Sequence, residues 1–153
     1  MSLLLFVHIF GAFLFLGNIV TAAFWKIRAD VTGNPVVIHR AAQNVMIADY
    51  AFTLPGLVLL TVSGIGMAVR TGALQSGFNW LALSLVLFAV TGALWLGILI
   101  PLQRSMIRHS KQSIEAGAVT EPYRRASRYW AVFGTITTLL PVVILYFMVA
   151  KSF

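Results

Sequence analysis

The residue with the most evident chemical potential is His8, which lies in a long apolar run near the start of the chain. A neutral imidazole is a common metal ligand and the usual proximal ligand of haem iron. Gly11 and Asn18 follow at spacings that place them on the same face of a helix as His8. Gly11, one turn away and without a side chain, leaves room beside the ring. We therefore predict that His8 is a metal ligand for b-type haem.

Helices that alternate in direction allow the residues at the depth of His8 to be identified. Ser63 and Tyr146 fall at that depth, with two methionines slightly nearer the surface, and a methionine thioether is a known axial partner of haem iron. Alternatively, His8 hydrogen-bonds Ser63 or Tyr146 and joins two helices, because an unpaired buried polar group costs about 1–3 kcal/mol. The predicted cofactor site consists of His8, Gly11, Asn18, Ser63, Met67, Tyr146 and Met148.

Asp49 is the one acidic residue within the long apolar runs of the sequence. An acid near a helix N-terminus is stabilised by the helix dipole, and Arg40 or Arg128 could form an ion pair with it. The second interpretation is a proton-accepting or cofactor-facing group that acts together with Asn18 and Thr53. Both interpretations remain open from the sequence.

Four apolar runs must position these residues: 3–24, 45–69, 80–102 and 129–150. Each run has 22 to 25 residues, which as a helix reaches about 33–38 Å, whereas the apolar core of a bilayer is about 30 Å thick. Backbone polar groups cannot remain unpaired in lipid, so spans of this length are helical. The sequence predicts an all-α fold, a four-helix transmembrane bundle that forms a single integral-membrane domain.

Composition excludes several other classes of protein. Hydrophobic residues make up 59% of the chain and charged residues 10%, compared with about 25% charged residues in a soluble domain. The absence of cysteine excludes disulfides, thiolate metal sites and cysteine nucleophiles.

The basic residues predict the orientation of the bundle. Nine of the eleven lysines and arginines lie in the gaps at 25–44 and 103–128, and short basic loops stay in the cytoplasm. Both termini are then on the outer, periplasmic side of a bacterial inner membrane. The net charge of +7 indicates contact with anionic lipids at the cytoplasmic face rather than with nucleic acid.

Turn and aromatic residues mark the ends of the spans. Gly33-Asn34-Pro35 predicts a turn, followed by a short interfacial helix that leads into the second span. Gly117 is expected to end a polar extension of the third span. The aromatic residues at the span ends predict an interfacial belt, whereas a deeper tryptophan belongs either to the core or to the wall of a ligand site. The belt residues are Trp25, Trp80, Tyr129 and Trp130, and the deeper residue is Trp95.

Four stretches of the chain resemble an uncharacterised bacterial integral-membrane family, domain of unknown function 2269. The most specific are the segment from His8 to Asn18 and the run Ile47-Ala-Asp49-Tyr-Ala-Phe-Thr53-Leu-Pro55. The pair Ser63-Gly64 and the segment 129–151 are similar as well. The resemblance covers essentially the whole chain. It implies a membrane fold but no particular activity.

A more distant resemblance is to the four-helix membrane protoporphyrinogen oxidases, which bind haem through a histidine in the first span. His8 matches that histidine in placement. Those enzymes also have a lysine in the third span, where this chain has Gln103 and Arg104. The resemblance implies haem binding through His8.

Together these observations predict an inner-membrane protein that holds b-type haem on His8 near the outer surface. Its role would be electron transfer, or that of an accessory in a respiratory or haem pathway, as a homo-oligomer or within a respiratory complex. One alternative is a structural or assembly protein without a cofactor. Another is a membrane oxidoreductase that acts on a porphyrin or a quinone.

Overall fold

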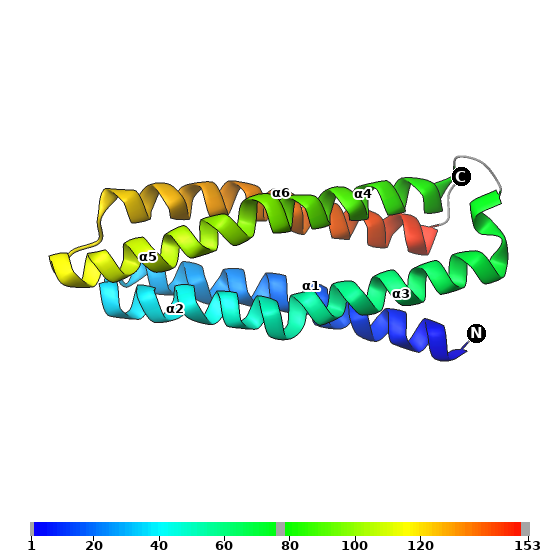
Figure 1. The fold of residues 1–153 in the computed structure, drawn as a ribbon, viewed down its shortest axis with the longest axis horizontal. Coiled ribbons are helices and arrows are strands. Elements are labelled where there is room, and N and C mark those ends of the chain that lie inside the picture. Colours follow the sequence, from blue (N-terminus) through cyan, green and yellow to red (C-terminus); the bar gives the residue numbers. More distant parts are fainter. Residues whose placement is uncertain (1, 76–78, 151–153) are drawn as a thin grey trace.

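The computed structural model describes residues 2–75 and 79–150, which form helices joined by short turns (Figure 1). The elements are, in chain order, α1 (Ser2–Val31), α2 (Pro35–Ala48), the π-helix η1 (Asp49–Thr53), α3 (Leu54–Thr71), the 3-10 helix η2 (Ala73–Gln75), α4 (Trp80–Leu94), the π-helix η3 (Trp95–Leu99), α5 (Ile100–Ala116) and α6 (Glu121–Ala150).

Four helical passes are long and apolar enough to cross a membrane: Ser2–Val31, Pro35–Thr71, Trp80–Ala116 and Glu121–Ala150. They run alternately up and down, and the start of α1 and the end of α6 lie at the same end of the bundle (Figure 1). The prediction of an all-α bundle of four spans is therefore confirmed.

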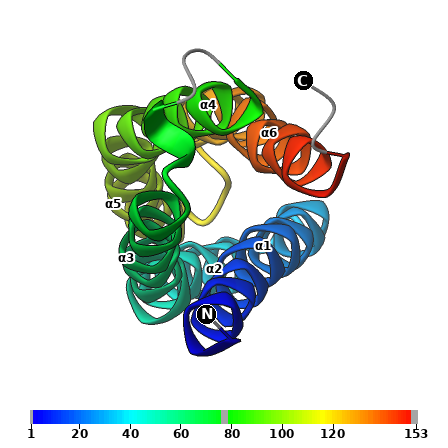
Figure 2. The ribbon, with the colours of Figure 1, turned by 90° about the vertical axis from the view of Figure 1, so that its right-hand side faces the viewer.

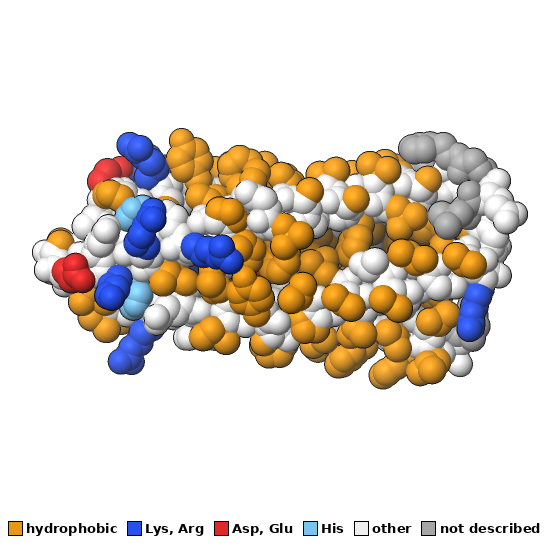
Figure 3. Space-filling model, viewed as in Figure 1, with side chains coloured by type: hydrophobic (Ala, Val, Ile, Leu, Met, Phe, Trp, Pro, Cys, Tyr) orange, Lys and Arg blue, Asp and Glu red, His pale blue; other side chains and the backbone are white. Residues whose placement is uncertain are grey.

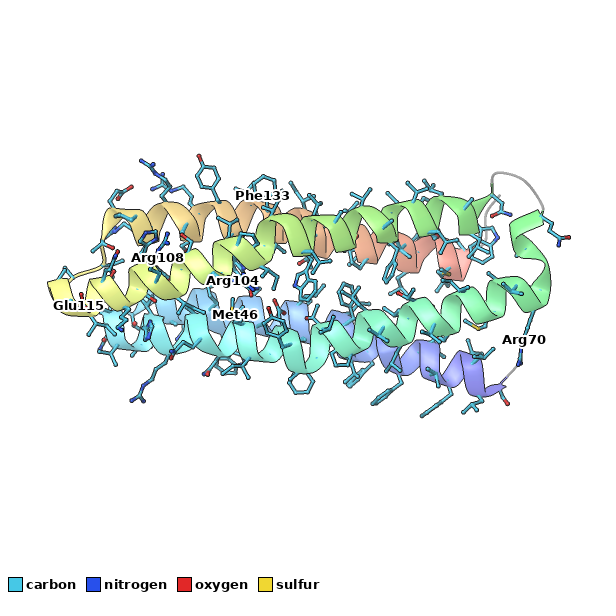
Figure 4. The ribbon with its side chains drawn as sticks, in the orientation of Figure 1. Met46, Arg70, Arg104, Arg108, Glu115 and Phe133 are labelled. Carbon is cyan, nitrogen blue, oxygen red and sulfur yellow. The ribbon has the colours of Figure 1, made fainter. Side chains whose placement is uncertain are left out.

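The helices extend beyond the predicted spans at the end of the bundle that contains α2 and α5. We call this the basic end, because lysine and arginine side chains gather there, with Arg104 and Arg108 on α5, whereas Arg70 lies at the opposite end (Figures 3 and 4). Apolar side chains cover the surface between the two ends (Figure 3). This separation agrees with a molecule whose middle faces lipid.

Two π-helical turns interrupt the second and third passes. In η1 and η3 the turn ends just before a proline, Pro55 or Pro101, that occupies the beginning of the next α-helix. Proline lacks an N–H and its ring clashes with the carbonyl four residues earlier, so a widened turn accommodates it without ending the helix. The predicted interfacial helix and the second span consequently form one continuous pass.

The turns between passes use the predicted residues. Gly33 has a φ of +63° and Asn34 caps α2 by accepting a hydrogen bond from the Val36 N–H. Gly117 ends α5 with a φ of +68°. Glycine tolerates this left-handed conformation, which explains why the helices end at these positions.

The helices α1 and α3 approach each other closely at Gly11 and Gly56. A Cβ atom added to Gly56 would lie 2.9 Å from the Phe15 backbone nitrogen, and one added to Gly11 would lie 3.0 Å from the Leu59 Cβ. The interpretation of Gly11 as room for a ligand is therefore wrong, because the backbone of α3 occupies that space.

Close backbone packing changes along the bundle. In the basic half, α2 packs against α5 and α5 against α6, around a core that includes Ile38, Met106 and Trp130. In the opposite half, close packing runs within the pairs α1–α3 and α4–α6 (Figures 1 and 2). Trp130 is buried in this core, so its assignment to the interfacial belt is wrong. Tyr129 and Trp25 are exposed, and their place in such a belt stays a prediction.

Candidate functional site between α1 and α6

Asp49 lies at the centre of a buried polar cluster in the basic half of the bundle. It is the first residue of η1 and Thr53 is the last, and the wide turn places the Thr53 hydroxyl 2.8 Å from Asp49 Oδ1, to which it donates. Asp49 is 5% exposed and Thr53 fully buried. The local sequence therefore creates an acidic group inside the apolar region.

Three other helices supply hydrogen-bond donors to this carboxylate. The Asn18 side-chain amide donates to Asp49 Oδ1 at 3.0 Å and to the Thr53 hydroxyl at 2.9 Å. The Trp95 indole N–H and the Gln103 amide donate to Asp49 Oδ2 at 3.2 and 2.5 Å. The structure therefore brings Asp49, Asn18 and Thr53 together, whereas a proton-accepting or cofactor-facing role for them stays a prediction.

The partners of Asp49 are all uncharged. An ionised carboxylate is purely an acceptor, so a set of four donors fits the charged form. Within residues 2–75 and 79–150, the one salt bridge joins Lys26 and Asp30, so the expected ion pair of Asp49 with Arg40 or Arg128 is wrong. A buried charge without an oppositely charged partner is costly. Acidic residues within membrane spans commonly mark functional sites, which makes Asp49 a candidate.

A cavity of about 420 Å³ lies beside this cluster, between α1 and α6. Asp49, Trp95 and Gln103 line its inner wall. Val20 and Leu139 also line it and are 55% and 57% exposed on the outside of the bundle. The cavity therefore opens sideways, toward the region that lipid would occupy, which we call the α1–α6 opening.

Two buried polar atoms, each on a residue that lines the cavity, lack a hydrogen-bond partner within the part of the chain that the structure describes. They are the Gln103 carbonyl oxygen Oε1 and the Trp130 indole nitrogen Nε1. Gln103 must present its amide nitrogen to Asp49, because the carbonyl oxygen would be repelled by the carboxylate. Two residues that line the cavity thus carry a buried acceptor and a buried donor without a partner, each of which costs about 1–3 kcal/mol while unpaired.

His8 lies in the opposite half, at the contact between α1 and α3. Its Nδ1 is 3.0 Å from the Ser63 hydroxyl, which itself donates to the Leu59 carbonyl. The hydroxyl proton is thereby committed, so the Nδ1–H of His8 donates to Ser63 Oγ and Nε2 carries the lone pair. A Cβ on Gly64 would lie 3.2 Å from the His8 ring. The hydrogen bond between His8 and Ser63, expected for a helix-pairing histidine, is present.

The other residues of the predicted cofactor site are distributed over both halves of the bundle. Asn18 belongs to the Asp49 cluster, ten residues from His8, or about 15 Å along the helix. Tyr146 is 64% exposed and its ring lies against Phe147. Met67 and Met148 are half-buried on α3 and α6. The structure therefore brings His8 and Ser63 together and separates them from Asn18.

A second polar network lies nearer the basic end. The buried Lys26 forms the salt bridge with Asp30 at 2.6 Å and also donates to Ser127. Asp30 accepts further hydrogen bonds from the hydroxyls of Tyr123 and Ser127, at 2.6 and 2.9 Å. Lys26 also lies 5.1 Å above the ring of Trp130. This network connects α1 to α6 immediately beside the α1–α6 opening.

Sequence reasoning missed Gln103, Trp130 and Lys26 as parts of these clusters. A usable signal was the position of the prolines: Asp49 and Trp95 each stand six residues before one, at Pro55 and Pro101. That shared offset marks the two π turns whose first residues meet across the cluster.

One protein-family model matches nearly the whole chain. Residues 2–152 match the model of a family described as predicted integral membrane protein (DUF2269). The chain belongs to this family. No curated protein and no solved structure matches the chain. Membership of DUF2269 agrees with the four apolar passes, whereas the resemblance to protoporphyrinogen oxidases stays a prediction.

Proposed function

We propose that this membrane protein takes up a lipid-soluble molecule through the α1–α6 opening and binds its polar head beside Asp49. The observation that carries the proposal is the pair of unpartnered buried atoms, Gln103 Oε1 and Trp130 Nε1, in the wall of one cavity. Native proteins pair almost all buried polar groups, so two exceptions at one cavity support a ligand that completes them.

The chemistry of the wall selects the head group. Trp130 supplies a donor and Gln103 an acceptor, so the head must both accept and donate a hydrogen bond. The nearby Asp49 carboxylate disfavours an anionic head. A neutral hydroxyl group on an apolar molecule, such as a phenol or the hydroquinone form of a quinone, meets both requirements. A volume of about 420 Å³ lies within the usual range of small-molecule sites.

The test uses 4-nonylphenol and 4-nonylanisole, which differ in the hydroxyl proton that only the phenol can donate. Binding to the purified, delipidated protein in detergent is measured by tryptophan fluorescence. We expect the phenol to bind about tenfold more tightly than the anisole, because only the phenol can pair with Gln103 Oε1. Trp130→Phe, which removes the free donor, is expected to weaken phenol binding by about tenfold.

Trp25→Phe is the matched control, because it makes the same chemical change at an exposed residue outside the cavity wall. Its affinity for nonylphenol should equal that of the unaltered protein. Equal affinity for both compounds, or equal effects of Trp130→Phe and Trp25→Phe, would refute the proposed binding mode.

Haem binding through His8 is a second candidate function. It is supported by the hydrogen bond from Nδ1–H to Ser63, which orients the ring and leaves Nε2 as the coordinating nitrogen. In this half of the bundle, α1 packs closely against α3, and α4 packs closely against α6. A flat haem between these two pairs would therefore contact α1 on one side. Met67, Met148 or a second subunit would supply the other axial ligand.

The visible spectrum of protein purified from haem-replete cells tests this candidate. A Soret band that disappears in His8→Ala and persists in His39→Ala is the expected result. A folded, colourless protein from the same cells would refute it.

We further infer that the chain lies in a bacterial inner membrane with the basic end in the cytoplasm. The concentration of arginines toward that end supports this orientation, because cytoplasmic loops carry the excess of basic residues. Anionic lipid head groups would then surround the basic end. Both termini would lie on the periplasmic side.

A further inference from the structure

A second cavity, of about 500 Å³, adjoins the first along the contact between α1 and α6. The two cavities share three lining residues, Ile27, Trp130 and Ala131. One contains the apolar walls around Asp49 and the other reaches the basic end. A single elongated molecule could therefore occupy both.

The charges of the second cavity are unequal. Its charged lining residues are three cations and one anion, Lys26, Arg124, Arg128 and Asp30, which gives a net charge of +2. Asp30 already pairs with Lys26 and accepts hydrogen bonds from two hydroxyls. In the described ranges, neither arginine has a carboxylate oxygen within 4.0 Å. Their charge is thus available to an anion.

The two cavities together impose an orientation on a ligand. The deep cavity contains the Asp49 carboxylate without a cationic partner and disfavours anions, whereas Arg124 and Arg128 attract them. An amphiphile would consequently place its anionic group at the basic end and its uncharged part beside Asp49.

We propose that the contact between α1 and α6 binds a phosphate-bearing lipid, with the phosphate at Arg124 and Arg128. A phosphomonoester carries a charge of about −1.5 to −2 at pH 7, which matches the excess of the cavity. Guanidinium groups bind phosphate oxygens through paired hydrogen bonds, more specifically than ammonium groups do. The inference goes beyond the proposed function and shares one element with it: the apolar part of the lipid would occupy the cavity beside Asp49, without requiring a hydroxyl group there.

The test compares didecanoyl phosphatidic acid with didecanoylglycerol, which has the same acyl chains but no phosphate. Their binding to the full chain in detergent is measured by native mass spectrometry and isothermal titration. We expect one bound phosphatidic acid and much weaker binding of the diglyceride. In the double variant R124Q/R128Q the dissociation constant for phosphatidic acid should rise about thirtyfold, since each basic residue near a membrane surface contributes about a factor of five.

The matched control is R108Q/R125Q, which removes the same number of charges. Arg108 and Arg125 are exposed on α5 and α6 but do not line this cavity. The control should keep the affinity within about threefold, since additional surface charges are largely screened. Inorganic phosphate at millimolar concentration should not displace the lipid.

Three outcomes would overturn the inference. Equal losses in the two double variants would indicate nonspecific attraction by surface charge. Displacement by inorganic phosphate would indicate a site for the free anion, and equal binding of the diglyceride would remove the role of the phosphate.

The nonylphenol experiment separates this inference from the proposed function. If nonylphenol binding depends on Trp130 but phosphatidic acid binding does not depend on Arg124 and Arg128, the proposed function stands and the lipid inference fails. Arginine-dependent lipid binding without nonylphenol binding would instead support the lipid inference and refute the proposed binding of a hydroxyl head group.

Discussion

Trp95→Phe and Trp130→Phe form a matched pair that tests the polar cluster before any ligand is known. Both tryptophans are buried, at 4% and 7% exposure, and both substitutions remove an indole N–H and shrink the ring. They differ in one respect. The Trp95 N–H donates to Asp49 at 3.2 Å, whereas that of Trp130 has no partner among residues 2–75 and 79–150.

The magnitude follows from that difference. The loss of ring volume is the same in both variants and cancels in the comparison. Trp95→Phe loses a hydrogen bond to a charged group, which contributes about 1.5–3 kcal/mol, whereas Trp130→Phe removes an unpaired donor that costs at least about 1 kcal/mol. Trp130→Phe also weakens the cation–π contact between Lys26 and this ring, which destabilises that variant by about 0.5 kcal/mol and reduces the difference by the same amount. Trp95→Phe should therefore be less stable than Trp130→Phe by about 2–3.5 kcal/mol.

The assay is the free energy of unfolding by SDS titration in mixed micelles, with protein freed of bound lipid. Near-equal free energies of the two variants, or a lower value for Trp130→Phe, would refute the assignment of Trp130 as an unpaired donor. A stabilised Trp130→Phe that also loses nonylphenol binding would support both the cluster and the site.

Three further predictions concern packing, charge and orientation. Gly56→Ala should lower the free energy of unfolding by about 1–3 kcal/mol, because its Cβ would meet the backbone of α1, whereas Gly92→Ala, with no neighbour within 4 Å, should be neutral or stabilising in the same SDS titration. Asp30→Asn should lower the free energy of unfolding by about 3 kcal/mol, because it leaves the buried Lys26 without its carboxylate partner. Adding Lys26→Met should restore part of that loss, and no recovery in the double variant would contradict the pairing. A reporter that is active only in the cytoplasm should give no signal when fused to the C-terminus, and activity there would reverse the orientation.

Much of the fold could be predicted because each apolar run carries its own signal. A span of more than 20 apolar residues specifies a membrane helix without reference to the rest of the chain. The turns at Gly33 and Gly117 are likewise local, since a left-handed φ favours glycine. The continuity through Pro55 was not predictable from the proline alone, because a π turn rather than a break accommodates it.

The candidate site depended on contacts between distant segments, and sequence reasoning recovered only part of it. Asp49 with Asn18 and Thr53 could be expected, because a polar group in lipid needs a partner and few were at its depth. Gln103 begins the polar extension of the third span, and only the packing of α2 against α5 brings its amide to Asp49, 54 residues away in the sequence. Gly11 was misread because a small residue beside a histidine fits a ligand and a neighbouring helix equally well.

The paired π turns also determine which side of α2 and α5 faces inward. Each turn holds one residue more than an α-helical turn, and one residue corresponds to a rotation of about 100° around the helix axis. Deleting a single residue from η1 alone would swing α2 around and carry Ile38 and Val45 away from α5. The phase of the helices, set by one extra residue in each of two passes, thus keeps the extensions at the basic end in register with the apolar part of the bundle.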